Sequence, residues 1–168
     1  MRCFTAEEAR TLLKDRLDGD GLPPRGFANK PVGRFSFSGH PISHLVSVSA
    51  AVIETVGPWE QAWWWVDNPD TWNRPLLPLY YHVRHAAHDF RLITEAPIHC
   101  FDLHERSELL ALVVVTLLNE WNAFLMTSHD YGRVLVTAGH RLTVARSDEV
   151  EFESIRRKLL GDGFIEVA

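Results

Sequence analysis

The chain has 168 residues, 46% of them hydrophobic, which is enough to bury one sizeable core. Its formal net charge of −5 gives no general attraction to a phosphate backbone, which argues against a nucleic-acid-binding protein. The longest apolar run, Leu109–Leu118, is far shorter than the roughly 20 residues that a membrane span needs. Because the N-terminal segment becomes charged at once, it does not resemble a secretory signal, and the sequence predicts one cytoplasmic domain over residues 1–168.

The first part of the chain is predicted to hold one helix and one strand. Thr5 and Glu8 have the spacing of a capping box, which predicts a helix that begins there and ends at the glycines of residues 19–21. Residues 22–33 contain prolines and glycines that predict a loop. Apolar and polar residues then alternate over residues 34–38, which predicts a short strand.

The middle of the chain is predicted to alternate helix, strand and helix. Apolar residues of Pro41–Val56 fall within a narrow arc of a helix, although a strand over His44–Ala51 is an alternative. Residues 60–66 include three consecutive tryptophans and predict a strand with large rings on both faces. A second helix is predicted over Leu79–Phe90. Its apolar face would consist of Leu79, Val83, Ala86, Ala87 and Phe90.

The densest apolar stretch, Asp102–Arg146, is predicted to supply the core. A strand over residues 97–101 precedes it, and a second capping box, Asp102 with Glu105, opens a long helix. A hairpin follows, with arms over residues 122–128 and 133–146, the second arm either continuous or divided at Gly139. A final helix begins after Ser147 and a short edge strand ends the chain. These elements predict an α+β fold, with a mostly antiparallel sheet packed against three or four helices in one pair of layers.

The sharpest chemical candidate is a run of histidines on the second helix. His82, His85, His88 and Asp89 share the face opposite its apolar stripe, and Zn²⁺ sites need three or four such ligands. His99 or His104 could close the site. This pattern supports one alternative function, a small metal-dependent hydrolase. A solvated polar face explains the same residues without a metal, and no metal ligand is assigned.

Two other groups of residues are weaker candidates for a catalytic site than the histidines of the second helix. Cys3 and Cys100 have no CxxC spacing, which indicates reduced thiols. His99 could not easily activate Cys100, because the two residues are adjacent on a predicted strand and their side chains point to opposite faces. Around the hairpin, two histidines with a tyrosine and an arginine could act as acid and base on a phosphodiester, although a polar turn is the favoured interpretation. They are His129, Tyr131, His140 and Arg141. The motifs that bind nucleotides or activate a serine do not occur, so no catalytic residue or cofactor is assigned.

Six tryptophans remain to be explained. Tryptophans fill cores and also anchor protein interfaces. If Trp63 and Trp65 enter the core, Trp64 faces the other layer, a partner or solvent. The predicted contact surface therefore comprises Trp64, Asp67, Asp70 and Trp72, with the His82, His85, His88 and Asp89 face as a second option. A structural subunit that forms a homo-oligomer through the tryptophan strand is a further possibility, and the oligomeric state stays open.

Three short segments resemble small bacterial α+β proteins that serve as immunity proteins for polymorphic or contact-dependent toxins. They are Glu120–Leu125, Asp130–Val136 and Gly139–Arg141. The resemblance implies a non-enzymatic binder of the immunity or antitoxin type, which occupies a toxin's active cleft through an acidic or aromatic surface. The sequence therefore predicts a protein partner, toxin-like in kind, and neither a nucleic acid nor a membrane.

Overall fold

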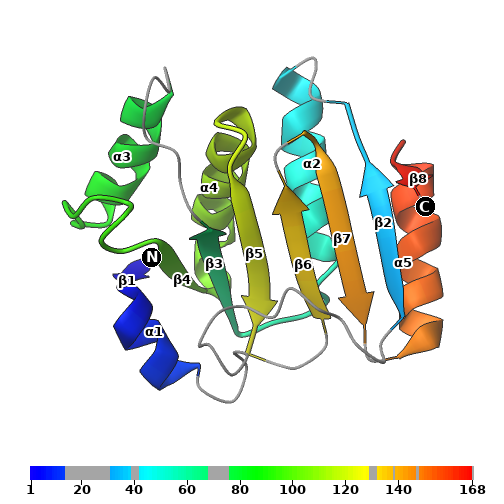
Figure 1. Ribbon diagram of the computed structural model, residues 1–168, viewed down its shortest axis with the longest axis horizontal. Coiled ribbons are helices and arrows are strands. Elements are labelled where there is room, and N and C mark those ends of the chain that lie inside the picture. Colours follow the sequence, from blue (N-terminus) through cyan, green and yellow to red (C-terminus); the bar gives the residue numbers. More distant parts are fainter. Residues whose placement is uncertain are drawn as a thin grey trace.

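The computed structural model describes residues 1–13, 31–38, 42–67, 76–128, 132–137, 139–146 and 148–167. Within these ranges, eight strands form one sheet in which all neighbouring strands run antiparallel (Figure 1). Their order across the sheet is β1-β4-β3-β5-β6-β7-β2-β8. The strands are β1 (Arg2–Phe4), β2 (Val32–Ser36), β3 (Gln61–Asp67), β4 (Ile98–Asp102), β5 (Asn122–Thr127), β6 (Gly132–Thr137), β7 (Arg141–Arg146) and β8 (Ile165–Val167).

The helices cover the sheet unequally. The main core joins one sheet face to four helices, whereas the first helix packs with a smaller apolar cluster on the opposite face. The helices are α1 (Ala6–Leu12), α2 (Ile42–Glu54), α3 (Leu77–Ala86), α4 (Arg106–Leu118) and α5 (Glu149–Gly161), with a 3-10 turn η1 (Leu103–Glu105) before α4. The predicted α+β fold with a mostly antiparallel sheet is confirmed. None of the helices in the described ranges is long and apolar enough to cross a membrane.

The core is built where the apolar density of the sequence predicted it. In α4, Leu109 and Leu112 are fully buried, and Leu125 and Val134 face them from the neighbouring strands β5 and β6. Burying such side chains stabilises a fold by roughly 1.5–3 kcal/mol each. The stretch 102–146 therefore forms the centre of the protein, as predicted.

Local signals correctly predicted several helix starts. Thr5 and Glu8 form the capping box of α1, and Asp102 and Glu105 form the one at η1. The segment that begins at Ile42 is helical, so the alternative strand over residues 44–51 is wrong. The predicted end of α1 at residues 19–21 and most of the loop over residues 22–33 lie outside the described residues.

The second predicted helix differs from expectation in both its end and its buried face. α3 ends at Ala86, because His88 adopts a left-handed backbone with φ of 58°. Tyr80 and Arg84, one turn apart, are its fully buried residues, while Phe90 is 70% exposed beyond the helix. The stripe chosen from hydrophobicity alone is therefore wrong: the helix is rotated so that an arginine faces inward.

Candidate functional site

The tryptophan strand belongs to the interior. Trp64 has no exposed surface, and its Nε1 donates a hydrogen bond to Thr116 Oγ1 of α4 at 3.0 Å. Trp63 and Trp65 point to the opposite sheet face, where they pack with Phe124 and α1. Trp64 therefore cannot contribute to a contact surface, and the prediction is wrong because helices cover both faces of β3.

The position of β3 in the sheet has a second consequence. Because β3 pairs with both β4 and β5, it has no free edge through which a homo-oligomer could form. The remaining members of the predicted tryptophan surface give no support. Asp67 is half-buried at the end of β3, whereas Asp70 and Trp72 lie outside the described residues.

The histidines of α3 are placed on the surface but do not converge on a metal. His82, His85 and His88 are all exposed, as the sequence predicted. Asp89 does not share their face, since its carboxylate is bonded to Arg84 and Arg91. In the part of the chain that the structure describes, no group of three histidine, cysteine, aspartate or glutamate residues could hold a metal ion. The geometry therefore gives the metal-dependent hydrolase no support.

Beside these histidines lies a stack of rings that the sequence did not reveal. Tyr81, His85 and Phe90 form an aromatic ridge, with ring centroids 6.1 Å apart for the first pair and 4.8 Å for the second. Phe90 is 70% exposed and Leu92, on the same loop, is 53% exposed. A large aromatic side chain held on the surface is a common anchor of protein interfaces. The aromatic ridge is the candidate contact site of this chain.

The Asp89 carboxylate fixes the turn that carries Phe90 through several hydrogen bonds. Asp89 Oδ1 accepts from Arg84 Nη2 at 2.8 Å and from the Arg91 backbone N–H at 3.0 Å, and Oδ2 accepts from Arg91 Nη2 at 2.5 Å. Arg91 Nη2 also donates to the Cys3 carbonyl at 2.8 Å, which joins the turn to β1. Although partial burial of Asp89 acts to raise its pKa, these hydrogen bonds hold that pKa well below its usual range.

Behind the ridge, two titratable side chains are sealed in the core. The Tyr80 hydroxyl and His99 Nε2 are 2.6 Å apart, and His99 Nδ1 is 3.3 Å from the Trp64 carbonyl. Burial lowers the pKa of His99 to about 3, so the ring is neutral near pH 7 and the hydroxyl donates to it. Burial also raises the pKa of Tyr80 well above its usual value. Both side chains are fully buried, which makes this pair structural rather than a metal ligand or a base.

The cysteines and the hairpin residues also have structural environments. Cys100 is a buried free thiol on the sheet face opposite His99, as expected, and burial raises its pKa. The ring of His140 meets Phe37 edge-on, with ring centroids 5.5 Å apart, and the His140 carbonyl accepts the Phe37 N–H at 3.1 Å. His129 and Tyr131 lie outside the described residues. The proposed acid–base set therefore stays a prediction, because two of its four members are among those residues.

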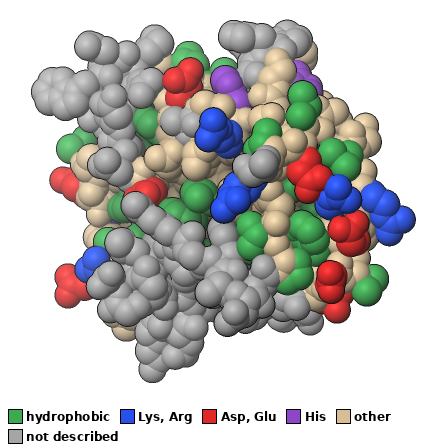
Figure 2. Space-filling model, turned by 45° about the vertical axis from the view of Figure 1, so that its right-hand side comes forward, with side chains coloured by type: hydrophobic (Ala, Val, Ile, Leu, Met, Phe, Trp, Pro, Cys, Tyr) green, Lys and Arg blue, Asp and Glu red, His purple; other side chains and the backbone are tan. Residues whose placement is uncertain are grey.

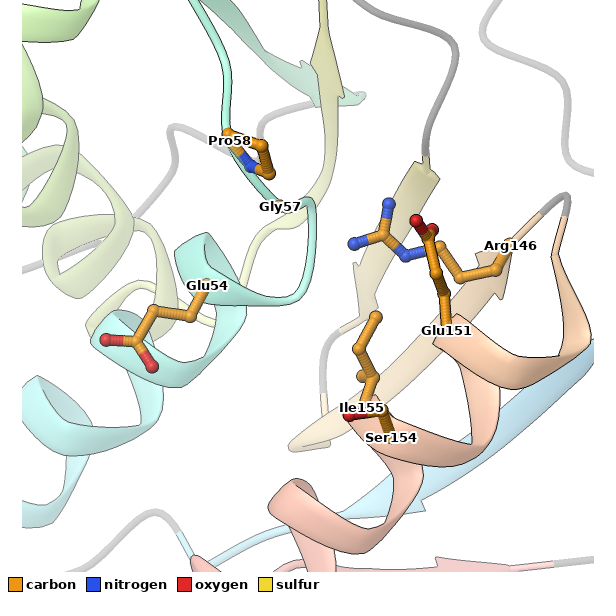
Figure 3. Close-up of a pocket in the computed structure, with 7 residues that line it drawn as sticks. All are labelled: Glu54, Gly57, Pro58, Arg146, Glu151, Ser154 and Ile155. Carbon is orange, nitrogen blue, oxygen red and sulfur yellow. The ribbon is translucent and has the colours of Figure 1, made fainter.

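A cavity of about 430 Å³ lies between the end of α2 and the beginning of α5 (Figure 3). Its wall contains the buried Arg146, whose Nη2 donates to the Thr55 carbonyl at the end of α2 and whose guanidinium lies near Glu151. Glu54, on the other side, pairs with Lys158 of α5 at 2.6 Å. A cation at a helix C-terminus stabilises the helix, so these charged groups hold α2, β7 and α5 together. An arginine at a strand end carries no sequence signal for this role.

The face on the α5 side of the molecule differs from the ridge in its charges. Figure 2 shows basic and acidic side chains next to one another there. On α5 and in the residues that follow it, Arg156 bonds Glu166 at 2.7 Å and Lys158 bonds Asp162 at 3.1 Å. These exposed pairs neutralise one another and contribute little to stability. Its most exposed apolar side chains, Val150 and Ile165, are aliphatic, whereas the ridge presents an exposed aromatic ring, Phe90.

Comparison with known proteins does not add a relative to this description. No protein-family model matches the chain, and neither a curated protein nor a solved structure is similar enough to count as one.

Proposed function

We propose that this chain is a non-enzymatic, cytoplasmic binding protein of the immunity or antitoxin type, which contacts its partner through the aromatic ridge. The observation that carries the proposal is the position of Phe90. It is 70% exposed, stacked on His85, and flanked by two residues whose side chains are bonded to each other. The partner's kind is inferred from the resemblance of Glu120–Leu125, Asp130–Val136 and Gly139–Arg141 to immunity proteins.

Phe90 should lose little conformational entropy on binding, because the turn that carries it is already ordered. Burying a phenylalanine side chain in a partner's pocket contributes roughly 1.5–3 kcal/mol, and preorganisation reduces the entropy lost on binding. Residues that dominate binding are typically aromatic and are surrounded by a polar rim. Phe90 fits the first description, and Leu92 adds apolar area beside it.

The exposed imidazoles fit the role of the rim. His82, His85 and His88 can each donate or accept a hydrogen bond at the edge of an interface. Asp89 belongs to the support of the surface, because both of its oxygens are already bonded within the chain. The proposed surface thus keeps the three predicted histidines and replaces Trp64 with Phe90.

Co-purification from the native host tests the proposal. The wild-type chain should retain one partner in stoichiometric amount, encoded next to its own gene. Phe90→Ala should weaken its binding at least about thirtyfold, which corresponds to about 2 kcal/mol for an interface anchor. Val150→Ala is the matched control, since Val150 is an equally exposed apolar residue, 78% exposed, on α5 at the other end of the sheet.

Two results would contradict the proposal. One is a partner bound equally well by the Phe90→Ala and wild-type chains. The other is stoichiometric zinc in protein purified without a histidine tag, lost on His85→Ala, which would support the hydrolase instead. Growth provides an independent readout: co-expression of the wild-type chain should relieve the toxicity of the neighbouring gene product, and Phe90→Ala should relieve it less than Val150→Ala.

A further inference from the structure

We propose that Arg84 is a positioning residue that presets Phe90 in its exposed orientation, although Arg84 itself touches no surface. What this says about a partner rests on the proposed function, but the geometric part concerns the free protein. Arg84 lies on α3, one turn beyond Tyr80, and its side chain has no exposed surface. Its guanidinium carbon is 5.7 Å from the centroid of the Tyr80 ring.

Stability alone does not account for an arginine at this position. Nη2 bonds Asp89 at 2.8 Å, but Nε and Nη1 have no hydrogen-bond partner among the described residues. A buried donor without an acceptor destabilises the folded state. Replacing a buried ion pair by apolar side chains of similar volume is often neutral or stabilising. The contribution of Arg84 must therefore be sought in what it holds in place.

Arg84 holds the first residue of the Phe90 turn in two ways. Its carbonyl accepts the Asp89 backbone N–H at 3.2 Å, and its side chain bonds the Asp89 carboxylate. Closing this loop forces the chain to reverse within four residues. His88 adopts a φ of 58° there, a conformation that costs free energy for any residue other than glycine. Two backbone bonds, from the His88 N–H to the His85 carbonyl at 2.9 Å and from the Asp89 N–H to the Arg84 carbonyl at 3.2 Å, account for this left-handed helix end. The Arg84 side chain adds the bond that fixes the Asp89 carboxylate.

The direction of Phe90 follows from these contacts. Its two neighbours in sequence, Asp89 and Arg91, are bonded to each other, and Arg91 continues to the Cys3 carbonyl of β1. The turn is thus attached to α3 through Arg84 and to the sheet through Arg91. Without Arg84, the side-chain link to α3 is lost, and the ring of Phe90 should leave its stack on His85.

Fluorine NMR of the free protein tests this inference. The chain is labelled with 4-fluorophenylalanine, and the Phe90 signal is assigned with Phe90→Leu. In Arg84→Met the Phe90 signal should narrow and move toward its position in the unfolded chain, and exchange of the Arg91 amide, which bonds Asp89, should accelerate at least about tenfold. Because Asp89 is only partly buried and keeps its bond to Arg91, Arg84→Met should still unfold cooperatively in urea, and both readouts are taken on the folded protein. Arg84→Lys, which keeps the charge, should restore part of the wild-type signal.

The matched control is Arg146→Met, which removes the other buried arginine, at the α2 end of the molecule. It should change stability and leave the Phe90 signal unaltered. An unchanged Phe90 signal and Arg91 exchange in folded Arg84→Met would overturn the proposal. Should Arg84→Met not fold, Arg84→Gln gives the same readout with the same decision, because it leaves the bonds between Asp89 and Arg91 in place.

Affinity separates this inference from the proposed function. The probe is the protein that co-purifies with the wild-type chain. Arg84→Met should bind it about tenfold to a hundredfold more weakly, because the turn must then be reordered on binding. If Phe90→Ala binds as well as the wild type, the proposed function fails while the NMR result still decides what Arg84 does. If Phe90→Ala binds the probe weakly and the turn loosens in Arg84→Met, but Arg84→Met keeps the wild-type affinity, the claim that Arg84 positions Phe90 for a partner is overturned.

Discussion

Mild acid should destabilise this fold through His99. The ring is fully buried, and burial lowers its pKa to about 3 in the folded chain, whereas an exposed histidine has a pKa of about 6.5. Between these values the unfolded chain binds a proton that the folded chain excludes. Stability is therefore fully present above pH 6.5 and is lost as the pH falls towards 3. At pH 5 the expected loss from His99 alone is about 2 kcal/mol.

Urea unfolding of the wild type and of His99→Gln, at pH 7 and pH 5, measures this contribution. Glutamine has no proton to gain and can accept the Tyr80 hydroxyl in place of Nε2. The variant should be less stable at pH 7 because its packing differs, but it should lose about 2 kcal/mol less than the wild type between the two pH values. His85→Gln controls for the removal of one imidazole. Equal losses in His99→Gln and the wild type would refute the idea that a neutral buried ring is being protonated on unfolding.

Two further predictions concern packing and the α2 terminus. In Gly33→Ala the new Cβ would lie 2.8 Å from the Phe35 ring and 2.9 Å from the Phe152 ring. Urea titrations should therefore show a loss of about 1–3 kcal/mol of unfolding free energy. A variant as stable as the wild type would contradict this prediction, since it would show that the rings move aside freely. Arg146→Met should cost about 1–3 kcal/mol, since the Thr55 carbonyl loses its donor, and an unchanged melting temperature would contradict the capping role.

Sequence reasoning succeeded where the determining forces are local. The capping boxes at Thr5 and Asp102 depend on residues three apart, and both are present. The alternation of β3 was also read correctly, with rings on both faces. The alternation could not show which helix would cover each face of β3. Trp64 was assigned to the surface because Trp63 and Trp65 were expected in the core. In the structure α4 covers Trp64 and α1 covers the other two, and the period of the strand does not reveal either contact.

The candidate site was harder to predict because it depends on tertiary partners. A helical projection places Arg84 with the polar residues, and only its bond to Asp89 after the helix end allows it to be buried. Once Arg84 faces inward, the helix rotates and ends early, and Phe90 leaves the predicted apolar stripe for the surface. The histidines were correctly predicted to be exposed, because the polarity of a side chain is enough to predict exposure. Polarity does not predict whether side chains converge on a metal ion.

The order of strands in the sheet has a consequence for how the chain folds. β2, near the start of the sequence, lies between β7 and β8, which come from the last quarter of the chain (Figure 1). β1 likewise pairs with β4, almost a hundred residues away, with Arg2 opposite Cys100. Closing such long loops precedes any gain from the contacts, so folding should be slow for a domain of this size. During synthesis, β3, β4, β5 and β6 can assemble first, whereas β2 must wait until β7 and β8 have left the ribosome.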